Sequence, residues 1–519
     1  MRLTEPGRAA SAFDELGFQK TTEDLLEEIR EMYLADPVPW VVGYSGGKDS
    51  TATLQLVWLA LAGIPAAERT KTIHVISTDT LVENPVVAAW VTKSLEKMRT
   101  AAENAGLPLV PHRLTPELHD TFWVNLIGKG YPAPRPKFRW CTERLKIRPS
   151  NNFISRVVRE NGECILVLGT RKAESAARAR SMERLERQRM RERLSPNAAL
   201  PNSLVYSPIE RWTNDDVWMF LMQVKNPWGY NNRDLLTMYQ GASADGECPL
   251  VVDSSTPSCG DSRFGCWVCT LVEQDKSMQA MIQNDEEKEW MLPLLELRNA
   301  LDVTDDRSLR DFRRMNGLVQ LFNKRPIPGP YTQAAREDWL RRVLEAQTWV
   351  RKNGPSYVRD LVLITPEELQ EIRRLWVIEK HEIEDNLPRI YKAATGQDYP
   401  GPTLDDNPVF GAEEMQILRE ICGDDTLHFE LTRQLLDVEH RHRSMARRAG
   451  LYDALQKAFT RGFYSSPDDA ADFASRKEDA RDAARRPAED RMGHLQLDLL
   501  SPSRDTAGKA AAKSTAKAR

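Results

Sequence analysis

The 519-residue sequence predicts an α/β fold, a doubly wound and mostly parallel sheet, with a helical C-terminal region. Up to about residue 223, short apolar runs alternate with stretches of helical spacing, which is typical of parallel strands covered on both faces. After Glu273 amphipathic patterns continue without further strands. The two halves are therefore expected to differ in architecture.

The predicted strands are 40–44, 72–77, 107–110, 164–168 and 204–208. The predicted helices are 21–34, 49–63, 85–104, 214–223, 332–353 and 366–380. Thr21 and Asp24 can form a capping box at the first helix, and Gly106 follows the end of the third. Because ligands bind at the carboxyl ends of parallel strands, the segments after the strands ending at 44, 77 and 168 are expected to share one cleft.

A chain of this length exceeds one ordinary hydrophobic core, so two or three domains are expected. We predict an α/β domain over 1–240 with an arginine-rich insertion at 176–195, and a cysteine-rich segment over 241–275. A helical domain over 276–486 and a disordered tail over 487–519 complete the chain. The tail is dominated by Ala, Lys, Arg, Ser and Asp and has too few apolar residues to fold alone.

The net charge of −4, with 29% charged residues, excludes a globally basic protein. Any contact with nucleic acid must therefore come from a local patch. No apolar run approaches the roughly 20 residues that span a bilayer, and residues 1–11 lack an apolar signal core. We therefore expect a cytoplasmic protein without a membrane partner.

The most specific motif is the run Ser45, Gly46, Gly47, Lys48, Asp49 and Ser50, which joins a predicted strand to a predicted helix. Adjacent glycines let backbone N–H groups approach an anion closely, and the helix start and the lysine add positive charge. The spacing is not that of a Walker A loop. We predict that all six residues bind a pyrophosphate and that Lys48 and Asp49 are catalytic. The alternative is an ordinary strand-to-helix turn.

Two further strand ends carry candidate ligands. Asp79 follows the second strand and can hold Mg²⁺ or a ribose hydroxyl, or serve as a helix cap. Gly169 follows a buried strand and admits close backbone approach, and Arg171 can reach a phosphate. The alternative for this second segment is a surface loop with ordinary charges.

Three cations, Arg139, Arg144 and Lys146, surround Cys141 in the run Phe138 to Lys146. Guanidinium groups suit phosphate binding, so we predict that these cations bind the nucleotide. Neighbouring cations would also favour a thiolate at Cys141, which we include among the catalytic residues. Whether this cysteine is a nucleophile, a sulfur carrier or a cluster ligand stays open. The alternative is a helix start with solvated charges and a buried cysteine.

The chain has seven cysteines, too few in this length for a disulfide scaffold. Four of them cluster, with ten, six and two residues between successive members: Cys248, Cys259, Cys266 and Cys269. Four thiolates can close a tetrahedral zinc site or an iron–sulfur cluster. Spacing alone favours zinc.

The run 178–193 holds seven arginines and three glutamates. It is a candidate contact for DNA phosphates, because the chain as a whole is not basic. The alternative is a solvated helix with ion pairs along its surface.

Five segments occur here in the order found in the phosphoadenosine phosphosulfate reductase superfamily: SGGKDS, STDT, FRWCTERLKI, LGTRKAES and PIERWTNDDVW. The resemblance covers roughly residues 20 to 275, and the first segment resembles the PP-loop of the ATP pyrophosphatases. It implies an adenine nucleotide α-hydrolase-like fold in which the SGGKDS loop and the glycine–arginine segment bind ATP with Mg²⁺. ATP would be cleaved between its α and β phosphates.

The segment FGCWVC, the chain length and the helical C-terminal half resemble the DndC-type sulfurtransferases of bacterial DNA phosphorothioation. That resemblance implies a [4Fe–4S] cluster on the clustered cysteines and DNA as substrate. It also implies a cysteine desulfurase and other Dnd proteins as partners. Related reductases use a cysteine from the FRWCT region, so Cys141 can replace Cys248 or Cys259 as a ligand.

Three rival functions remain open at this point. A sulfonucleotide reductase shares the fold but needs no ATP cleavage and releases sulfite. A tRNA-thiolating PP-loop enzyme shares the ATP chemistry and a cluster. A non-catalytic nucleotide-binding subunit would keep the cluster for structural reasons only.

Overall fold

The computed structural model describes residues 10–242, 264–404, 410–443, 445–481 and 483. They form two compact units. The sheet unit comprises the described residues of 1–306, 331–379 and 385–407, and the helical unit those of 307–330, 380–384 and 408–519. The expected boundary at 275 falls inside the sheet unit. Hydrogen bonds from Trp123 Nε1 to the Leu363 carbonyl (2.7 Å) and from Trp376 Nε1 to the Ile127 carbonyl (3.0 Å) tie later helices to the α/β core.

The sheet unit contains a six-stranded sheet in the order β3-β2-β1-β4-β6-β5. Its strands are β1 Trp40–Gly43, β2 Ile73–Thr78, β3 Leu109–Leu114, β4 Cys164–Val167, β5 Ser195–Pro196 and β6 Ser203–Tyr206. All neighbours are parallel except β5 and β6. The chain runs outward from β1 through β2 to β3, and then from β4 to β6 on the other side. This confirms the doubly wound prediction and places the switch point between β1 and β4.

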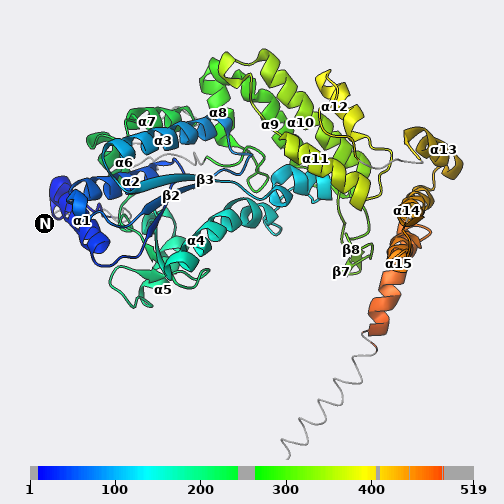
Figure 1. The fold of residues 1–519 in the computed structure, drawn as a ribbon, viewed down its shortest axis with the longest axis horizontal. Helices are drawn as coiled ribbons and strands as arrows, with labels where there is room; N and C mark the ends of the chain where they lie inside the picture. The colour runs from blue at the N-terminus through cyan, green and yellow to red at the C-terminus, as the bar shows by residue number, and fades with distance from the viewer. Residues whose placement is uncertain (1–9, 243–263, 405–409, 444, 482, 484–519) are drawn as a thin grey trace, which may run out of the picture. The chain divides into compact units, whose positions relative to one another are not determined.

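Helices cover both faces of this sheet (Figure 1). They are α1 Gly17–Leu34, α2 Lys48–Ala62, α3 Pro85–Asn104, α4 Arg148–Asn161, α5 Ala176–Glu186, α6 Asn214–Gln223 and α7 Asn232–Gly241. Alternate strand residues point to opposite faces. Trp40 and Val42 enter a core with residues of α1, α2, α3, α6 and α7, whereas Val41 packs against Phe153 and Ile154 of α4.

Most predicted elements of this sheet are present, with several differences. α1 begins at Gly17, so Thr21 and Asp24 lie inside the helix and form no capping box at its start. β5 and α7 were not predicted. β3 runs to Leu114, beyond the predicted end at 110, because His112 and Arg113 pair with Ile76 and Ser77 of β2 despite their polarity. On this edge strand polar side chains can remain partly solvated. Helix α4 was not predicted, since its arginine-rich sequence hides an amphipathic face.

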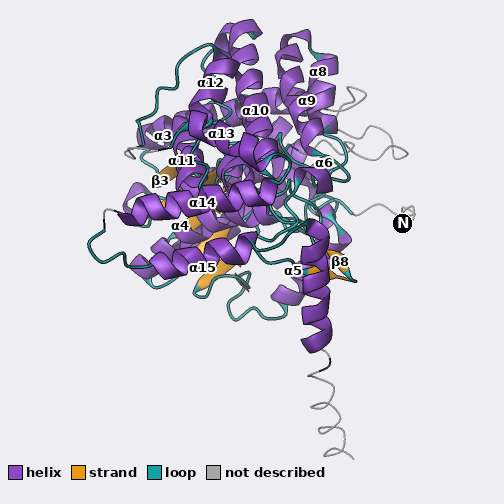
Figure 2. Ribbon diagram, turned by 90° about the vertical axis from the view of Figure 1, so that its right-hand side faces the viewer, coloured by secondary structure: helices purple, strands orange, loops and turns teal. Residues whose placement is uncertain are grey.

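Five further helices complete the sheet unit: α8 Lys276–Asn284, α9 Leu292–Leu301, α10 Gln333–Asn353, α11 Pro366–Arg374 and α12 Leu387–Thr395. Figure 2 shows these segments as helices joined by loops. The predicted helical character of the C-terminal half is thus confirmed. Among the described helices, none combines the length and the apolar content needed to cross a bilayer.

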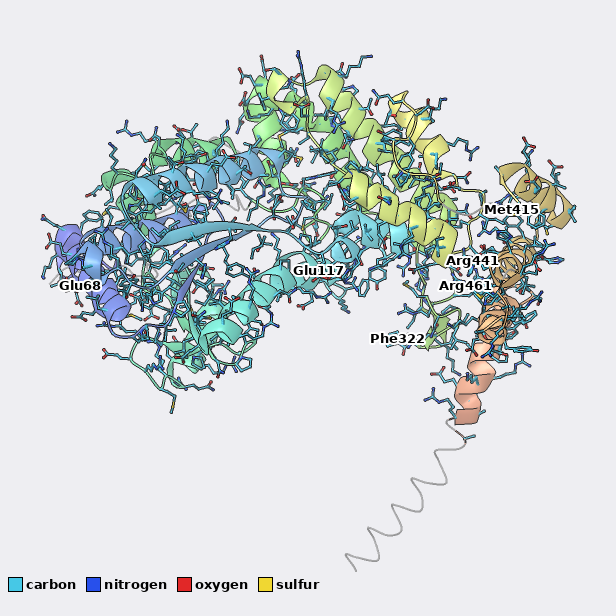
Figure 3. All side chains as sticks on the ribbon, in the orientation of Figure 1. Glu68, Glu117, Phe322, Met415, Arg441 and Arg461 are labelled. Atoms are coloured by element: carbon cyan, nitrogen blue, oxygen red, sulfur yellow. The ribbon has the colours of Figure 1, made fainter. Side chains whose placement is uncertain are left out.

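The helical unit contains α13 Ala412–Cys422, α14 Thr426–Arg443 and α15 Leu451–Gly462, with a hairpin of β7 Leu321–Phe322 and β8 Arg325–Pro326. Buried ion pairs replace part of an apolar core here. Arg313 is 3% exposed and pairs with Asp311 (2.8 Å) and Glu430 (2.6 Å). Arg441 and Arg461, labelled in Figure 3, lie on α14 and α15.

The stability of the sheet unit depends on pH through the buried carboxyl group of Glu368. Its carboxylate accepts the Thr365 N–H (2.9 Å) in the capping box of α11, but the residue is only 2% exposed, and burial raises its pKa to about 7. A carboxyl group with a raised folded-state pKa stabilises the fold fully below its usual pKa, and this stability is lost as the pH rises through about 7.

We therefore expect Glu368→Gln to raise the melting temperature at pH 8 by about 2–4 °C for each kcal/mol gained in the free energy of unfolding. The amide oxygen still accepts the Thr365 N–H, and the buried charge is removed. At pH 5 the variant and the parent should melt together. Calorimetry at both pH values checks this. An equal shift at both would contradict the titration argument.

Candidate functional site

The carboxyl ends of β1, β2 and β4 open into one cleft of about 1090 Å³. Ten residues predicted to bind the nucleotide line it: Ser45, Gly46, Gly47, Lys48, Asp49, Ser50, Asp79, Lys146, Gly169 and Arg171. The three strand-end segments therefore share a cleft, as expected for parallel strands around a switch point.

The loop before α2 has the geometry of an anion site. Gly46 adopts φ +76°, and a Cβ there would lie 2.5 Å from Val91 Cγ2, so both conformation and space require glycine. α2 begins at Lys48 after Gly47, which supplies no side-chain cap. The first turn of α2 thus directs its positive end at the cleft. Ser50 Oγ donates to the Gly47 carbonyl (3.0 Å) and stiffens the loop.

Asp49 sits between two cations. Its Oδ1 accepts from Arg171 Nε (2.6 Å), and its Oδ2 lies 3.3 Å from Lys48 Nζ. Arg171 is 4% exposed and also donates to the Trp212 carbonyl (3.2 Å), so it is fixed between two elements. Arg171 therefore lines the cleft while holding Asp49, the second residue of α2.

Gly169 makes this arrangement sterically possible. A Cβ on Gly169 would lie 2.7 Å from the Asp49 carbonyl oxygen and 2.9 Å from Thr53 Oγ1. The segment after β4 thus packs directly on the backbone of α2. The close approach at Gly169 is made to the protein's own helix, and a role of this glycine in nucleotide binding stays a prediction.

Asp79 lines the cleft in a turn. Its Oδ1 accepts from the Leu81 N–H (2.9 Å), and its Oδ2 accepts from Arg113 Nε (3.1 Å). Asp79 therefore stabilises a turn through Oδ1 and also lines the cleft. Ligation of Mg²⁺ or ribose by Asp79 stays a prediction.

The three cations of the predicted phosphate block separate in space. Lys146 lines the cleft and pairs with Glu83 (3.2 Å). Arg144 donates to Asn125 Oδ1 (3.0 Å), stacks on Tyr131 and lines a second groove. Arg139 is exposed, donates to the Pro136 carbonyl (3.2 Å), and is not among the described residues that line either cavity.

Cys266 and Cys269 lie beside the cleft because the segment 265–267 pairs with the loop after β2. The Trp267 N–H donates to the Val82 carbonyl (2.9 Å), and the backbone of Cys266 forms an isolated antiparallel β-bridge with Glu83. Cys266 Sγ is 3.4 Å from Thr80 Oγ1. Burial first, and then the Glu83 carboxylate, raises the pKa of the Cys266 thiol to about 12.

The nearby thiols also shift the pKa of Lys146. Burial would lower it, but the charges of Cys266 and Glu83 raise it above its usual value. Lys146 therefore connects the thiols with the cleft. Cys248 and Cys259 lie outside the described residues. Within the described ranges, no group of three or more His, Cys, Asp or Glu side chains is arranged to hold a metal ion.

The expected activation of Cys141 by neighbouring cations is wrong. Burial raises the pKa of this thiol, and the nearby Cys269 raises it further. The flanking cations are engaged elsewhere, since Arg144 bonds Asn125 and Lys146 pairs with Glu83. Cys141 instead lies close enough to Cys269 for the two to interact electrostatically.

The arginine run divides into two parts. Arg189 pairs with Glu210 (3.0 Å), Arg191 with Glu163 (2.9 Å), and Arg193 with Glu28 (3.2 Å). These three are fastened to other elements. Arg180, Arg184 and Arg187 are exposed around α5, and no ion pair joins them to another described residue. Arg189, Arg191 and Arg193 lie after the end of α5, so the expected solvated helix with ion pairs along its surface does not describe this part of the run.

Sequence reasoning missed several cleft residues, among them Glu83, Arg113, Tyr239 and Phe264. Arg113 was detectable in principle, because a longer β3 carries its end to the same edge of the sheet. Tyr239 stacks edge-on against Phe264, with ring centroids 4.8 Å apart, and its hydroxyl approaches the Lys48 N–H (3.4 Å). No local motif marks those two residues.

Residues 39–232 match the phosphoadenosine phosphosulfate reductase domain family. An uncharacterized protein of Methanocaldococcus jannaschii is 26% identical over 258 residues, which is 50% of this chain. The match covers 39% of that relative, well under two thirds of its length. The α/β part of the chain is thus similar in sequence to this domain family.

Two solved structures are similar to the chain at low identity. The phosphoadenylyl-sulfate reductase of Candida auris, in a phosphate complex, is 14% identical with a TM-score of 0.25, covering 41% of this chain and 90% of that one. The U34-tRNA thiolase NcsA of Methanococcus maripaludis, with its [4Fe–4S] cluster, is 15% identical with a TM-score of 0.28, covering 57% of this chain and 82% of that one.

Gly169→Ala tests the contact between the β4 segment and α2. The added methyl group meets backbone, so we expect a loss of about 1–3 kcal/mol in stability, as in other overpacked sites. Gly241→Ala is the matched control, because a Cβ at Gly241 meets nothing within 4 Å. Urea denaturation of both variants is the measurement. Equal stability of the two would contradict the packing described above.

Proposed function

We propose that this chain, which carries a phosphoadenosine phosphosulfate reductase-type domain over residues 39–232, is an ATP-dependent sulfurtransferase acting on DNA. It activates a backbone phosphate by adenylation and inserts sulfur at a non-bridging oxygen. One observation carries the proposal. Glu83, whose Oε1 lies 3.8 Å from Cys266 Sγ, and Lys146, which interacts electrostatically with that thiol, line the same cleft as the loop 45–50. A phosphate activated on the loop would therefore share the cleft with the two side chains that adjoin the Cys266 thiol.

ATP fits this site through its phosphates. The uncapped start of α2, Gly46 and Lys48 offer N–H groups and positive charge to a pyrophosphate. A pyrophosphate competes with Asp49 for Lys48, which frees Asp49 Oδ2 while Arg171 keeps Oδ1. The freed oxygen and Asp79 are the carboxylate ligands that Mg²⁺ would use. Bound Mg²⁺ would neutralise charge on the phosphates.

The proposed reaction has two displacements at phosphorus. A non-bridging DNA oxygen attacks the α-phosphorus of ATP, and the bond to the β-phosphate breaks with loss of pyrophosphate. Hydrosulfide, formed when a thiol reductant breaks the S–S bond of the donor's persulfide and is itself oxidised to a disulfide, then forms a bond to the DNA phosphorus, and AMP leaves with the former DNA oxygen. The chain contributes positioning and charge neutralisation through the loop, Lys48 and Arg171.

The sulfur donor is proposed to be a cysteine desulfurase, working with other Dnd proteins. Cys266, Cys269 and the nearby Cys141 are the described thiols that can take part in a [4Fe–4S] cluster. They do not form a complete ligand group among the described residues. A fourth ligand would come from Cys248 or Cys259, and no step above depends on the cluster.

A second candidate is a sulfonucleotide reductase, because the family match is to that type of domain. Such an enzyme releases sulfite from a sulfonucleotide and does not split ATP. The two functions therefore differ in their products, AMP with pyrophosphate in one case and sulfite in the other.

We expect the protein, incubated anaerobically with ATP, duplex DNA and a cysteine desulfurase, to release AMP and pyrophosphate. Lys48→Ala should lower the rate at least about 100-fold, since it removes a charge from the reacting phosphates. Lys93→Ala, which changes an exposed lysine of α3, is the matched control. Full activity of Lys48→Ala would refute the site, and sulfite release from a sulfonucleotide would favour the reductase.

The cluster has its own test. We expect the anaerobically purified protein to contain iron and sulfide with visible absorption, both lost in Cys266→Ala and Cys141→Ala. Cys422→Ala, in α13 of the helical unit, should keep them. Iron retained in Cys141→Ala would assign all ligands to the segment 248–269. Zinc in place of iron would contradict the cluster.

A further inference from the structure

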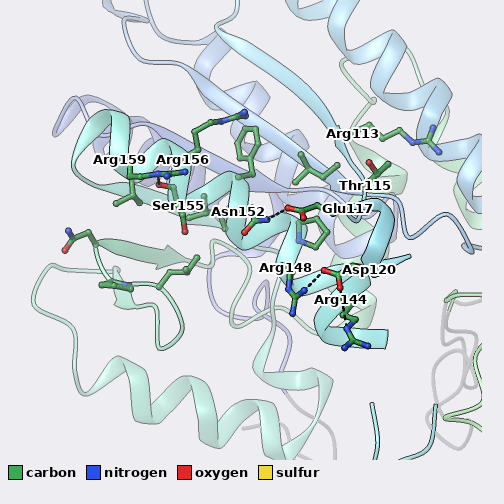
Figure 4. Close-up of a pocket in the computed structure, with 18 residues that line it drawn as sticks. Arg113, Thr115, Glu117, Asp120, Arg144, Arg148, Asn152, Ser155, Arg156 and Arg159 are labelled. Carbon is green, nitrogen blue, oxygen red and sulfur yellow. Dashed lines mark hydrogen bonds and ion pairs between the residues drawn. The ribbon is translucent and has the colours of Figure 1, made fainter. Parts of the chain in front are cut away.

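A second groove, of about 930 Å³, runs beside α4 in the sheet unit (Figure 4). Five arginines line it, against only two carboxylates, Glu117 and Asp120. The arginines are Arg113, Arg144, Arg148, Arg156 and Arg159. In a chain with a net charge of −4, this groove is a local concentration of positive charge.

The arrangement follows from the two faces of α4. Phe153, Ile154 and Val157 are buried against the sheet. Arg148, Arg156 and Arg159 occupy the other side of the helix, where Figure 4 shows them along the groove. At 1.5 Å per residue, the distance along the helix from Arg148 to Arg159 is about 16 Å. One phosphate group cannot span that distance.

Two of these arginines have no acidic partner among the residues that the structure describes. Arg156 lies over the Phe153 ring, 4.8 Å from its centroid, and Arg159 Nε donates to the Ser155 carbonyl (3.3 Å). Both are exposed. By contrast, Arg148 and Arg144 share Asp120, and Arg113 is held by Asp79. The groove thus combines fixed arginines at one end with uncompensated ones at the other.

The groove also meets the nucleotide cleft. Arg113 and Ile154 line both cavities, and Arg113 bonds Asp79 at the cleft itself. An extended anion lying along α4 would therefore lead towards the loop 45–50. A DNA strand carries one phosphate per about 3.4 Å of helix axis, so several consecutive phosphates match the row of arginines.

We propose that the groove along α4 binds the phosphodiester backbone of a nucleic-acid strand and guides it to the cleft. The identification of that strand as the DNA substrate rests on the proposed function. Arg156 and Arg159 form new ion pairs with backbone phosphates, and Arg113 marks the passage between groove and cleft. This surface is distinct from the run 178–193, whose last three arginines are already paired.

The test measures binding of a fluorescent 20-base-pair DNA duplex to the full-length chain at several salt concentrations. We expect Arg156→Gln/Arg159→Gln to weaken binding about 10-fold and to lower the salt slope by about 1.8, or 0.9 for each lost phosphate contact. Arg156→Lys/Arg159→Lys should restore most of the affinity. Arg233→Gln/Arg359→Gln removes the same charge from exposed positions outside the groove and should bind normally.

Equal binding by the groove variant and the parent would overturn the proposal, as would an equal loss in the control pair. Competition by inorganic phosphate at the same phosphate concentration would also overturn it, because a single-anion site would then suffice. A groove variant that loses DNA affinity, in a protein that makes no AMP from ATP, would support the groove and reject the proposed function. If the parent forms AMP from ATP and the groove variant keeps its DNA affinity, the proposed function is supported and the groove is rejected.

Discussion

The packing of Gly169 on the first turn of α2 is the constraint on which the site depends. At the switch point β1 and β4 are neighbours, so the segments that follow them must pass close together. A side chain at 169 would collide with the Asp49 carbonyl. Its absence allows Arg171, two residues later, to reach Asp49 and to fix the start of α2. The anion-binding loop is therefore held from both sides of the switch point.

Electrostatics divides the site into regions of different character. Around the loop, Lys48 and Arg171 compensate one carboxylate, so added phosphate charge is favourable. Around Cys141 and Cys266, burial raises the pKa of both thiols, and Lys146 is the cation that connects this region to the cleft. A buried thiol with a raised pKa is a poor nucleophile, but metal binding would remove its proton. This favours a ligand role over a nucleophilic role for Cys141.

The arginines of the sheet unit differ in whether the fold gives them acidic partners. Arg189, Arg191 and Arg193 form ion pairs with carboxylates of other elements, which are Glu210, Glu163 and Glu28. On α4 the apolar side chains face the sheet, whereas Arg156 and Arg159 have no acidic partner among the described residues and are exposed along a groove that meets the cleft. The number of arginines in a segment is thus a weaker predictor of anion binding than the presence or absence of acidic groups beside them in the fold.

The alternation of apolar strands and helices, together with the glycine-rich loop, was enough to predict the doubly wound sheet and the cleft at its carboxyl edge. These features depend on local periodicity and on residues adjacent in sequence. Tertiary structure alone decided which charges meet. It paired Arg171 with Asp49 and separated Arg139 from Lys146. It also brought Cys141 near Cys269, because the partner of a charged or buried side chain lies on another element, at a distance along the chain that no local pattern encodes.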